Sequence, residues 1–454
     1  MAVVVAPGTM SAEEIVSLSR RYTLYEWSAQ NAVDPIPVDH AEGVYFYTPD
    51  GKRYLDFNSQ LMSVNIGHGD QRVINAIKAQ VDKLAYANPF MATEPRARLG
   101  QKLAELMPGD IDVAFFTNGG AEANEHAIRM ARTFTGRQKV VTRYQSYHGA
   151  TLAAMAATGD NRRIFSEPHM PAGFVKTLDP YRYRCRFCTG EAKCNLNCAD
   201  AVEETVLGEG PETVAAILVE PITGYSGIVV PPDGYLKRLR DLCDRYGILL
   251  IFDEVIDGFC RTGKWFASEH WGVEPDIMTV AKGITSGYVP LGAAIVSDRV
   301  AGYFDDHYLG SGLTYAAHPL ACAAGVATLE VYLEEELADR AARMGKKLMK
   351  RLEEMADKHP SVGEVRGLGM LAAIELVRDK ATREPFTPQR VESRNAEMTE
   401  VVKAVWEKGS RPAFRWNLVI IAPPLTISED ELDEGLDAIE AGLEVADRHV
   451  AAAV

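Results

Sequence analysis

The sequence predicts an α/β fold in which a mostly parallel sheet forms a large domain and the two ends of the chain form a smaller α+β domain. The first observation is that strand and helix patterns alternate over residues 61–329, and the second is that the strand candidates are short apolar runs bounded by turn residues. Such runs are typical of parallel strands buried on both faces of a sheet. The third observation is a change of pattern after residue 329. We therefore expect residues 1–60 to join the small domain, residues 61–329 to form the large domain, and residues 330–454 to complete the small domain.

The N-terminal segment is predicted to contain one helix and two short strands. The helix and the aromatic-rich loop that follows it occupy residues 11–34. Short strands are expected at residues 44–47 and 54–57, because turn residues separate these two runs. A glycine-rich turn at residues 65–69 then leads into a helix over residues 71–83.

Strands alternate with helices through the predicted large domain. The strand candidates are residues 113–117, 139–142, 214–219, 248–252, 277–280 and 293–297. Residues 168–200 contain cysteines and prolines and are predicted to be an insertion loop.

The remainder of the small domain is predicted to follow a long helix over residues 317–336. Its strands are expected at residues 363–377 and 418–423, and its helices at residues 392–408 and 429–446. The last helix is the best defined, because Ser428 and Glu431 have the spacing of a capping box.

Composition and charge restrict the possible partners. The chain of 454 residues carries a formal net charge of −15 and has no dense run of Lys and Arg, so we expect a small-molecule substrate and no nucleic acid. No run approaches the roughly 20 apolar residues that span a bilayer, so no membrane partner is expected. The N-terminus lacks the basic region of a signal peptide, and we therefore expect a cytoplasmic protein.

Four of the seven cysteines lie close together in the sequence, as Cys185, Cys188, Cys194 and Cys198. The first pair has the spacing of a zinc knuckle, but only a short loop separates it from the second pair. Free thiols, a structural zinc site and disulfides all remain open, and a reducing cytoplasm favours free thiols. No catalytic metal is expected, because no nearby acid or histidine offers an open coordination position.

Two predicted strands within residues 248–290 each deliver one ionisable residue at the carboxyl end, Asp253 and Lys282. Ligands of α/β sheets bind outside the carboxyl ends of parallel strands, so the acid and the amine are expected to meet there. Desolvation would lower the pKa of the Lys282 amine and make it available for a Schiff base, while Asp253 would keep a pyridine nitrogen protonated. Together they indicate pyridoxal 5′-phosphate as the cofactor. The alternative is that Asp253 caps a helix and Lys282 is a solvated loop residue.

Other predicted strands are also followed by residues suited to a cofactor. Gly119 and Gly120 open a helix whose free N–H groups would bind a phosphate, although most glycine turns only connect elements. Tyr147 would stack on a flat heterocycle or, alternatively, be an ordinary buried loop aromatic. Glu220 ends another strand. Convergence of such residues at one edge of a sheet is what a cofactor site requires.

Six motifs occur in order along the chain: TNGGAEAN, SYHG, VEPITG, FDEVIDGFCRTG, TVAKG and GLTYAAHPLACAA. Together they resemble the class III (omega) aminotransferases, which are fold type I pyridoxal-phosphate enzymes, and the resemblance extends over nearly the whole chain. It implies a mostly parallel sheet of the seven-stranded type in a large, cofactor-binding domain.

The resemblance implies a role for each matching residue. Lys282 would be the catalytic lysine that binds the cofactor and moves the proton, and Asp253 would pair with the pyridinium nitrogen. The other cofactor-binding residues would be Gly119, Gly120 and Ala121 at the phosphate, Tyr147 and Val255 on opposite ring faces, His148 and Glu220 in the same site, and Thr314 at the phosphate of the neighbouring subunit. A homodimer or a dimer of dimers, with the active site at the subunit interface, is therefore implied. Family members often carry a hydroxyl residue at the position of Ala121, so one phosphate contact is expected to be absent.

Substrate-binding residues are implied in the same way. In the ornithine and 4-aminobutyrate branches an acid pairs with a C-terminal arginine, and Tyr225 stands in the place of that acid here. Arg411 or Arg415 would then alternate between binding a carboxylate and making room for an apolar group, or be a surface residue, and spacing does not decide between the two. Met62 replaces the family's tryptophan as a softer wall, and Tyr147 is expected beside the substrate.

The activity implied is transamination by a ping-pong mechanism, from a primary amine or an omega-amino acid to pyruvate or a similar 2-oxo acid. An aminomutase or a racemase would use the same site, and transfer between two separate substrates would distinguish them. A non-catalytic, ligand-sensing regulator is disfavoured, because the acidic chain shows no DNA-binding module. The exact donor and acceptor, the stereopreference and the assembly beyond a dimer stay open.

Overall fold

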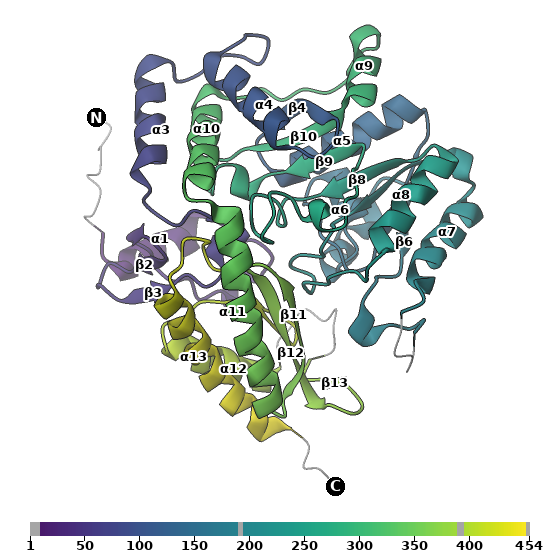
Figure 1. Cartoon of the computed structure of the whole chain (residues 1–454). Helices are drawn as coiled ribbons and strands as arrows, with labels where there is room; N and C mark the ends of the chain where they lie inside the picture. Colours follow the sequence, from purple (N-terminus) through teal and green to yellow (C-terminus); the bar gives the residue numbers. More distant parts are fainter. Residues whose placement is uncertain (1–9, 189–193, 388–394, 451–454) are drawn as a thin grey trace.

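The computed structural model describes residues 10–188, 194–387 and 395–450. The described residues form a seven-stranded central sheet, a three-stranded N-terminal sheet and a five-stranded C-terminal sheet, with helices packed around them (Figure 1). Every helix in these ranges is too short or too polar to cross a membrane.

The central sheet contains the strands predicted for residues 61–329, together with one strand that was not predicted. They are β4 (Ile111–Thr117), β5 (Lys139–Arg143), β6 (Phe174–Thr177), β7 (Val214–Val219), β8 (Leu249–Asp253), β9 (Ile277–Val280) and β10 (Gly292–Ser297). Their spatial order is β4-β10-β9-β8-β7-β5-β6. The pairs from β6 through β9 are parallel, and β10 is antiparallel to both of its neighbours. The predicted α/β class with a mostly parallel sheet is therefore confirmed.

Three adjacent strands bring chemical groups to one edge of the central sheet. Every residue of β7, β8 and β9 is buried, as expected for strands covered on both faces. In the register of β8 with β9, Asp253 lies beside Thr279. Because the three strands are parallel, the residues that end or follow them, Glu220, Asp253 and Lys282, emerge at the same edge.

Helices cover the central sheet on two sides. Over the whole of the described residues the α-helices are α1 (Ala12–Tyr22), α2 (Ser59–Met62), α3 (Gln71–Lys83), α4 (Glu94–Leu106), α5 (Gly120–Thr135), α6 (Leu152–Ala157), α7 (Asn197–Glu209), α8 (Tyr235–Tyr246), α9 (Asp298–Asp306), α10 (Pro319–Glu334), α11 (Leu337–Lys358), α12 (Ala396–Glu407) and α13 (Glu429–Ala446). Of these, α5, α7 and α8 show how the central sheet is covered. Alternate side chains of β7 point in opposite directions: Ile217 and Val219 pack with α7 and α8, whereas Ala216 and Leu218 pack with α5. This alternation follows from the two-residue period of a strand.

The two ends of the chain pack against each other. The N-terminal sheet comprises β1 (His40–Glu42), β2 (Tyr45–Tyr47) and β3 (Arg53–Leu55), and the C-terminal sheet comprises β11 (Val362–Leu368), β12 (Leu371–Asp379), β13 (Glu384–Pro385), β14 (Ala413–Arg415) and β15 (Leu418–Ile421). Tyr45 Oη donates to Glu434 of α13 at 2.9 Å, and Arg53 pairs with the same carboxylate at 3.0 Å. Figure 1 shows β2 and β3 beside α13 accordingly.

Some sequence-based predictions of single elements are wrong. Residues 168–200 are not simply an insertion loop, because they contain β6, a short and mostly half-buried strand that pairs in parallel with β5, and the start of α7. The single strand predicted at residues 363–377 is the hairpin of β11 and β12, which turns at Gly369 with φ = 58°. The first residues of the helix predicted at 392–408 lie outside the described residues, and α12 accounts for the rest. The 22-residue helix α11 was not predicted.

Candidate active site

The N-terminus of α5 forms one wall of a cavity of about 370 Å³. Gly119, Gly120 and Ala121 all line this cavity, and no described side chain caps the helix. A Cβ atom at Gly120 would lie 2.9 Å from both methyl carbons of Val255, so a larger residue there would force the helix start and Val255 apart. The uncapped N–H groups and the helix dipole make this wall suitable for a phosphate.

Asp253, at the end of β8, is a buried carboxylate held by three hydrogen bonds. Oδ2 accepts from Asn124 Nδ2 at 2.7 Å and lies 2.8 Å from His148 Nδ1, while Oδ1 accepts from the backbone N–H of Val255 at 3.1 Å. Asn124 is itself fixed by Thr279, whose hydroxyl donates to Asn124 Oδ1 at 2.8 Å. These contacts fix the orientation of the carboxylate on the floor of the cavity.

Lys282 follows β9 and lines the same cavity as Asp253. Its backbone has φ = 45°, in the left-handed region that non-glycine residues rarely adopt. Burial lowers the pKa of its amine to about 8, and the charge of Asp253 partly opposes that shift. Roughly a tenth of the amine is therefore neutral at pH 7, far more than for an ordinary lysine, and the neutral form is the one that acts as a nucleophile.

Glu220, the residue directly after β7, holds the loop that carries Tyr147. Its Oε1 accepts from the backbone N–H of Tyr147 at 3.1 Å, and its Oε2 accepts from that of Gly224 at 2.7 Å. Burial raises the pKa of the Glu220 carboxyl. The ring of Tyr147 and the side chain of Val255 both line the cavity, where they could flank a flat ring.

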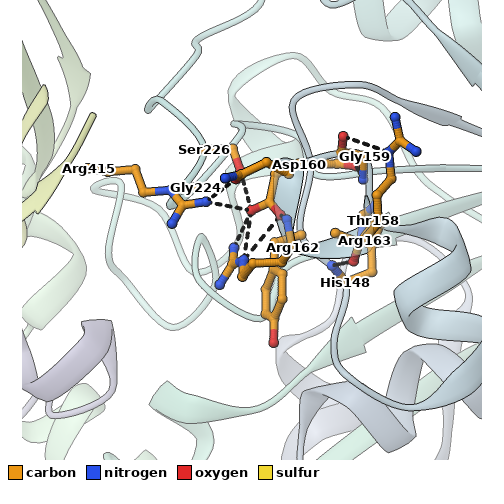
Figure 2. A network of polar contacts seen from close by, with 12 residues as sticks. His148, Thr158, Gly159, Asp160, Arg162, Arg163, Gly224, Ser226 and Arg415 are labelled. Carbon is orange, nitrogen blue, oxygen red and sulfur yellow. Dashed lines mark hydrogen bonds and ion pairs between the residues drawn. The ribbon is translucent and has the colours of Figure 1, made fainter. Parts of the chain in front are cut away.

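A second cavity of about 400 Å³ shares Lys282 and Tyr147 with the first. Predicted substrate-binding residues Met62, Tyr225 and Arg415 line it, together with Trp27 and Arg162. Arg415 Nη2 donates to Asn161 Oδ1 at 2.6 Å and lies 3.5 Å from Asp160 Oδ2. Figure 2 shows the guanidinium groups of Arg162 and Arg415 reaching the carboxylate of Asp160 from two sides.

Two predicted site residues, Arg411 and Thr314, line neither of the two cavities. The guanidinium carbon of Arg411 stacks on the rings of Tyr54 and Trp406, at 4.2 Å and 4.5 Å from their centroids, and Arg415 alone of the two arginines lines the second cavity. Thr314 is exposed, and its carbonyl accepts a hydrogen bond from Tyr86 Oη at 2.8 Å.

The structure adds site residues for which no role was predicted. Asn124 stands in the TNGGAEAN motif, and a polar residue at that point of a buried helix face could have indicated its contact with Asp253. Arg162 belongs to a short 3₁₀ helix, Asn161–Phe165, for which no pattern in the sequence indicated a site. It faces the second cavity because Asp160 binds its guanidinium.

The cysteines are free thiols in the structure, and Cys188 Sγ lies 4.0 Å from Cys194 Sγ. Within residues 10–188, 194–387 and 395–450, no three His, Cys, Asp or Glu side chains are arranged to hold a metal ion.

The first cavity matches the chemical groups of pyridoxal phosphate. It offers an uncapped helix start for a phosphate, a carboxylate for a ring nitrogen and an amine with a lowered pKa. It also contains His148 Nε2, a buried nitrogen with no hydrogen-bond partner among the described residues, which a bound polar group would satisfy. Fold and site together define a pyridoxal-phosphate enzyme of fold type I.

Comparison with known proteins identifies the family within that class. The family model "Aminotransferase class-III" matches residues 27–443. The chain is 35% identical over 410 residues to the putrescine–pyruvate aminotransferase of Pseudomonas aeruginosa, covering 87% of this chain and 88% of that one. The taurine:2-oxoglutarate aminotransferase of Bifidobacterium kashiwanohense, solved with pyridoxal phosphate and glutamate, superposes with a TM-score of 0.93 at 40% identity, over 97% of this chain and 99% of that one. An (S)-enantioselective omega-transaminase of Thermomicrobium roseum gives a TM-score of 0.90 at 38% identity, over 96% and 99%. This chain therefore belongs to the class III aminotransferases and is a pyridoxal-phosphate-dependent aminotransferase.

Proposed function

We propose that this aminotransferase moves an amino group from a primary amine or an omega-amino acid to pyruvate or a similar 2-oxo acid. The observation that carries the proposal is the second cavity, which leads from Lys282 along the apolar and aromatic walls of Met62, Trp27 and Tyr225 to the guanidinium of Arg415. Apolar walls suit the carbon chain of an amine, and a guanidinium suits the carboxylate of a 2-oxo acid. The putrescine–pyruvate and omega-transaminase activities named for similar proteins support this choice.

We infer a ping-pong mechanism for this transfer. Donor and acceptor would both have to reach Lys282 through the same second cavity, so they would occupy it in turn. Tyr225 stands at the position where related branches have an acid, and Arg415 pairs instead with Asp160, whose Oδ2 lies 3.5 Å from its Nη2. Its guanidinium carbon lies 5.6 Å from the Tyr225 ring centroid, close enough for the ring to accompany its movement.

The roles of the residues follow from their positions. Bound pyridoxal phosphate supplies an electron sink for the carbon from which a proton is lost. Lys282 would hold this cofactor through Nζ and move the proton, since its lowered pKa lets the amine both accept and release it. Asp253 would hold the ring nitrogen, and the N–H groups at the start of α5 would hold the phosphate. Tyr147 and Val255 would enclose the ring and exclude water.

We further propose a cytoplasmic homodimer, or a dimer of dimers, with the active site at the subunit interface. Thr314 lies on the surface of its own chain, where its hydroxyl would be available to the phosphate site of a neighbouring copy. A Thr314→Ala variant that keeps the assembly of the wild type but retains the cofactor less well would support this arrangement.

A lysine-to-alanine pair tests the proposal. Lys282→Ala should lose all amino transfer between a primary amine or omega-amino acid and pyruvate, whereas Lys264→Ala, which changes an exposed lysine between β8 and β9, should retain it. The assay is a panel of amines, omega-amino acids and alpha-amino acids with pyruvate. Full turnover by Lys282→Ala, or turnover of alpha-amino acids alone by the wild type, would contradict the proposal.

A further inference from the structure

Four consecutive residues have a left-handed backbone where the chain reaches the second cavity. Ser59, Gln60, Leu61 and Met62 have φ values of 47°, 47°, 65° and 62°, and none of them is glycine. The short helix α2 that they form is therefore a left-handed turn. Residues other than glycine avoid this conformation, because the Cβ atom crowds the following carbonyl oxygen, and they adopt it singly rather than in runs. Surrounding contacts must therefore hold the turn in place.

The turn presents two side chains to the second cavity. Leu61 and Met62 both line this cavity, Leu61 with an exposed side chain and Met62 with a buried one. Met62 belongs to an apolar cluster that also contains Ile222 and Trp416. In a right-handed or extended backbone the Cα–Cβ bonds of both residues would point in other directions. The shape of this part of the wall therefore depends on the conformation of the turn.

The carboxylate of Asp56 holds the turn by its backbone. Oδ1 accepts hydrogen bonds from the N–H groups of Asn58, at 3.4 Å, and Gln60, at 3.1 Å. The side chain is only 2% exposed, so its second oxygen needs a partner within the protein. That partner is His68, whose Nε2 lies 2.9 Å from Oδ2. Because a carboxylate only accepts hydrogen bonds, Nε2 is the donor.

His68 is anchored outside the turn. Its backbone N–H donates to Gly43 O at 2.7 Å, and the N–H of Gly43 donates to His68 O at 3.0 Å. Its side chain lines neither of the two cavities, and neither does that of Asp56. The imidazole can therefore act on the cavity wall only through the carboxylate.

We propose that His68 is a positioning residue for the amino donor, because it holds the left-handed turn through Asp56 and the turn shapes the wall that a large amine contacts. The imidazole itself touches no substrate. A donor with a large apolar group would depend on this wall, whereas a donor too small to reach it would not. This inference rests on the proposed function, because it concerns which donors fit the second cavity.

Hydrogen exchange of the holoenzyme tests the hold on the turn without any substrate. The peptide over residues 56–64 is followed by mass spectrometry. Leucine cannot donate to Asp56, so His68→Leu should exchange this peptide roughly 10-fold faster than the wild type. Glutamine carries an N–H donor that can take the place of Nε2, so His68→Gln should exchange almost as slowly as the wild type.

A matched control removes a second histidine that pairs with an aspartate. His40 Nδ1 lies 2.8 Å from Asp39 Oδ2, and both side chains are exposed. His40→Leu should therefore leave both the exchange of the peptide over residues 56–64 and the kinetics unchanged.

Steady-state kinetics tests the effect on donor choice. With pyruvate as acceptor, His68→Leu should raise KM for benzylamine by roughly 10-fold relative to KM for ethylamine, the effect of a displaced apolar wall. The kcat values should change little, because Lys282 and Asp253 lie outside the turn. Partial unfolding of the variant would instead lower kcat for both amines alike.

A glycine variant separates positioning from folding. Gln60 is exposed and has φ = 47°, a conformation that glycine adopts without strain. The double variant Gln60→Gly/His68→Leu should therefore recover the wild-type ratio of the two KM values although the pair with Asp56 stays broken. If His68→Leu alone does not fold, this double variant and His68→Gln carry the test.

An unchanged exchange rate or an unchanged KM ratio in His68→Leu would overturn the inference. So would a double variant that folds but keeps a raised KM for benzylamine. Failure of the proposed function is distinguishable, because the wild type would then transfer no amino group from either amine to pyruvate.

Discussion

Replacing Lys282 by methionine should stabilise the cofactor-free protein at neutral pH. The pKa of this amine falls from 10.5 to about 8 because burial disfavours the cation. The unfolded chain therefore binds more protons than the folded one between these two values. The stability contributed by the neutral amine is fully present above pH 10.5, and it is lost as the pH falls to about 8.

The size of the effect follows from the shift. A change of about 2.5 in pKa corresponds to about 3 kcal/mol, at about 1.4 kcal/mol for each unit. Because the side chain lies against a cavity that admits water, we expect about 1 to 3 kcal/mol at pH 7. Methionine has no charge to desolvate, so Lys282→Met should be more stable than the wild type by this amount at pH 7 and by much less at pH 10.5.

The assay is denaturant unfolding of both proteins, stripped of cofactor, at a series of pH values. Only the difference between the two proteins matters, so other titrating groups cancel. A methionine variant that is no more stable at pH 7, or a gap that stays constant up to pH 10.5, would refute the reasoning. The first result would mean that the lysine is charged and well solvated in the folded state.

Three further substitutions test other parts of the site. Asp253→Asn should weaken cofactor retention by roughly 10-fold or more, measured by equilibrium dialysis, because a neutral amide replaces the charged acceptor of its hydrogen bonds; unchanged retention would contradict its role. Gly120→Val should release cofactor in the same assay, since even a Cβ there lies 2.9 Å from Val255; normal retention would show that the helix start does not hold the phosphate. Tyr225→Asp should raise KM for pyruvate by about 10-fold, because the new acid would compete for Arg415; an unaffected KM would mean that this arginine does not bind the acceptor.

The central sheet could be predicted because most of its strands are recognisable from their own apolar sequences. Residues 214–219 are an unbroken apolar run, and only Thr279 interrupts the apolar run at residues 277–280. Both are strands that are buried along their whole length. β6 could not be found in this way, because it has four residues, three of them only half-buried, and it is ordered by pairing with β5. The proposed boundaries at residues 60 and 329 remain predictions.

Some residues of the site could likewise be predicted from the sequence, and others could be identified only from the structure. Asp253 and Lys282 end or follow parallel strands, and the rule for such strands was enough to expect them in one cavity. The choice between Arg411 and Arg415 needed the structure, since β14 carries Arg415 to the second cavity, whereas Arg411 precedes this strand and stacks on Tyr54. The sequence did not indicate that Arg162 belongs to the site. Its position depends on its contact with Asp160 and on the rings of Trp27 and Tyr147, which come from other segments of the chain.

The contact between the two ends of the chain has a consequence for synthesis. Tyr45 precedes its partner Glu434 by 389 residues, and the ribosome makes the chain from the N-terminus. At roughly 5 to 20 residues per second, β2 and β3 would wait on the order of 20 to 80 seconds before α13 is translated. During that interval the nascent N-terminal strands lack the part of their native surface that α13 supplies, so we expect a chaperone to bind there.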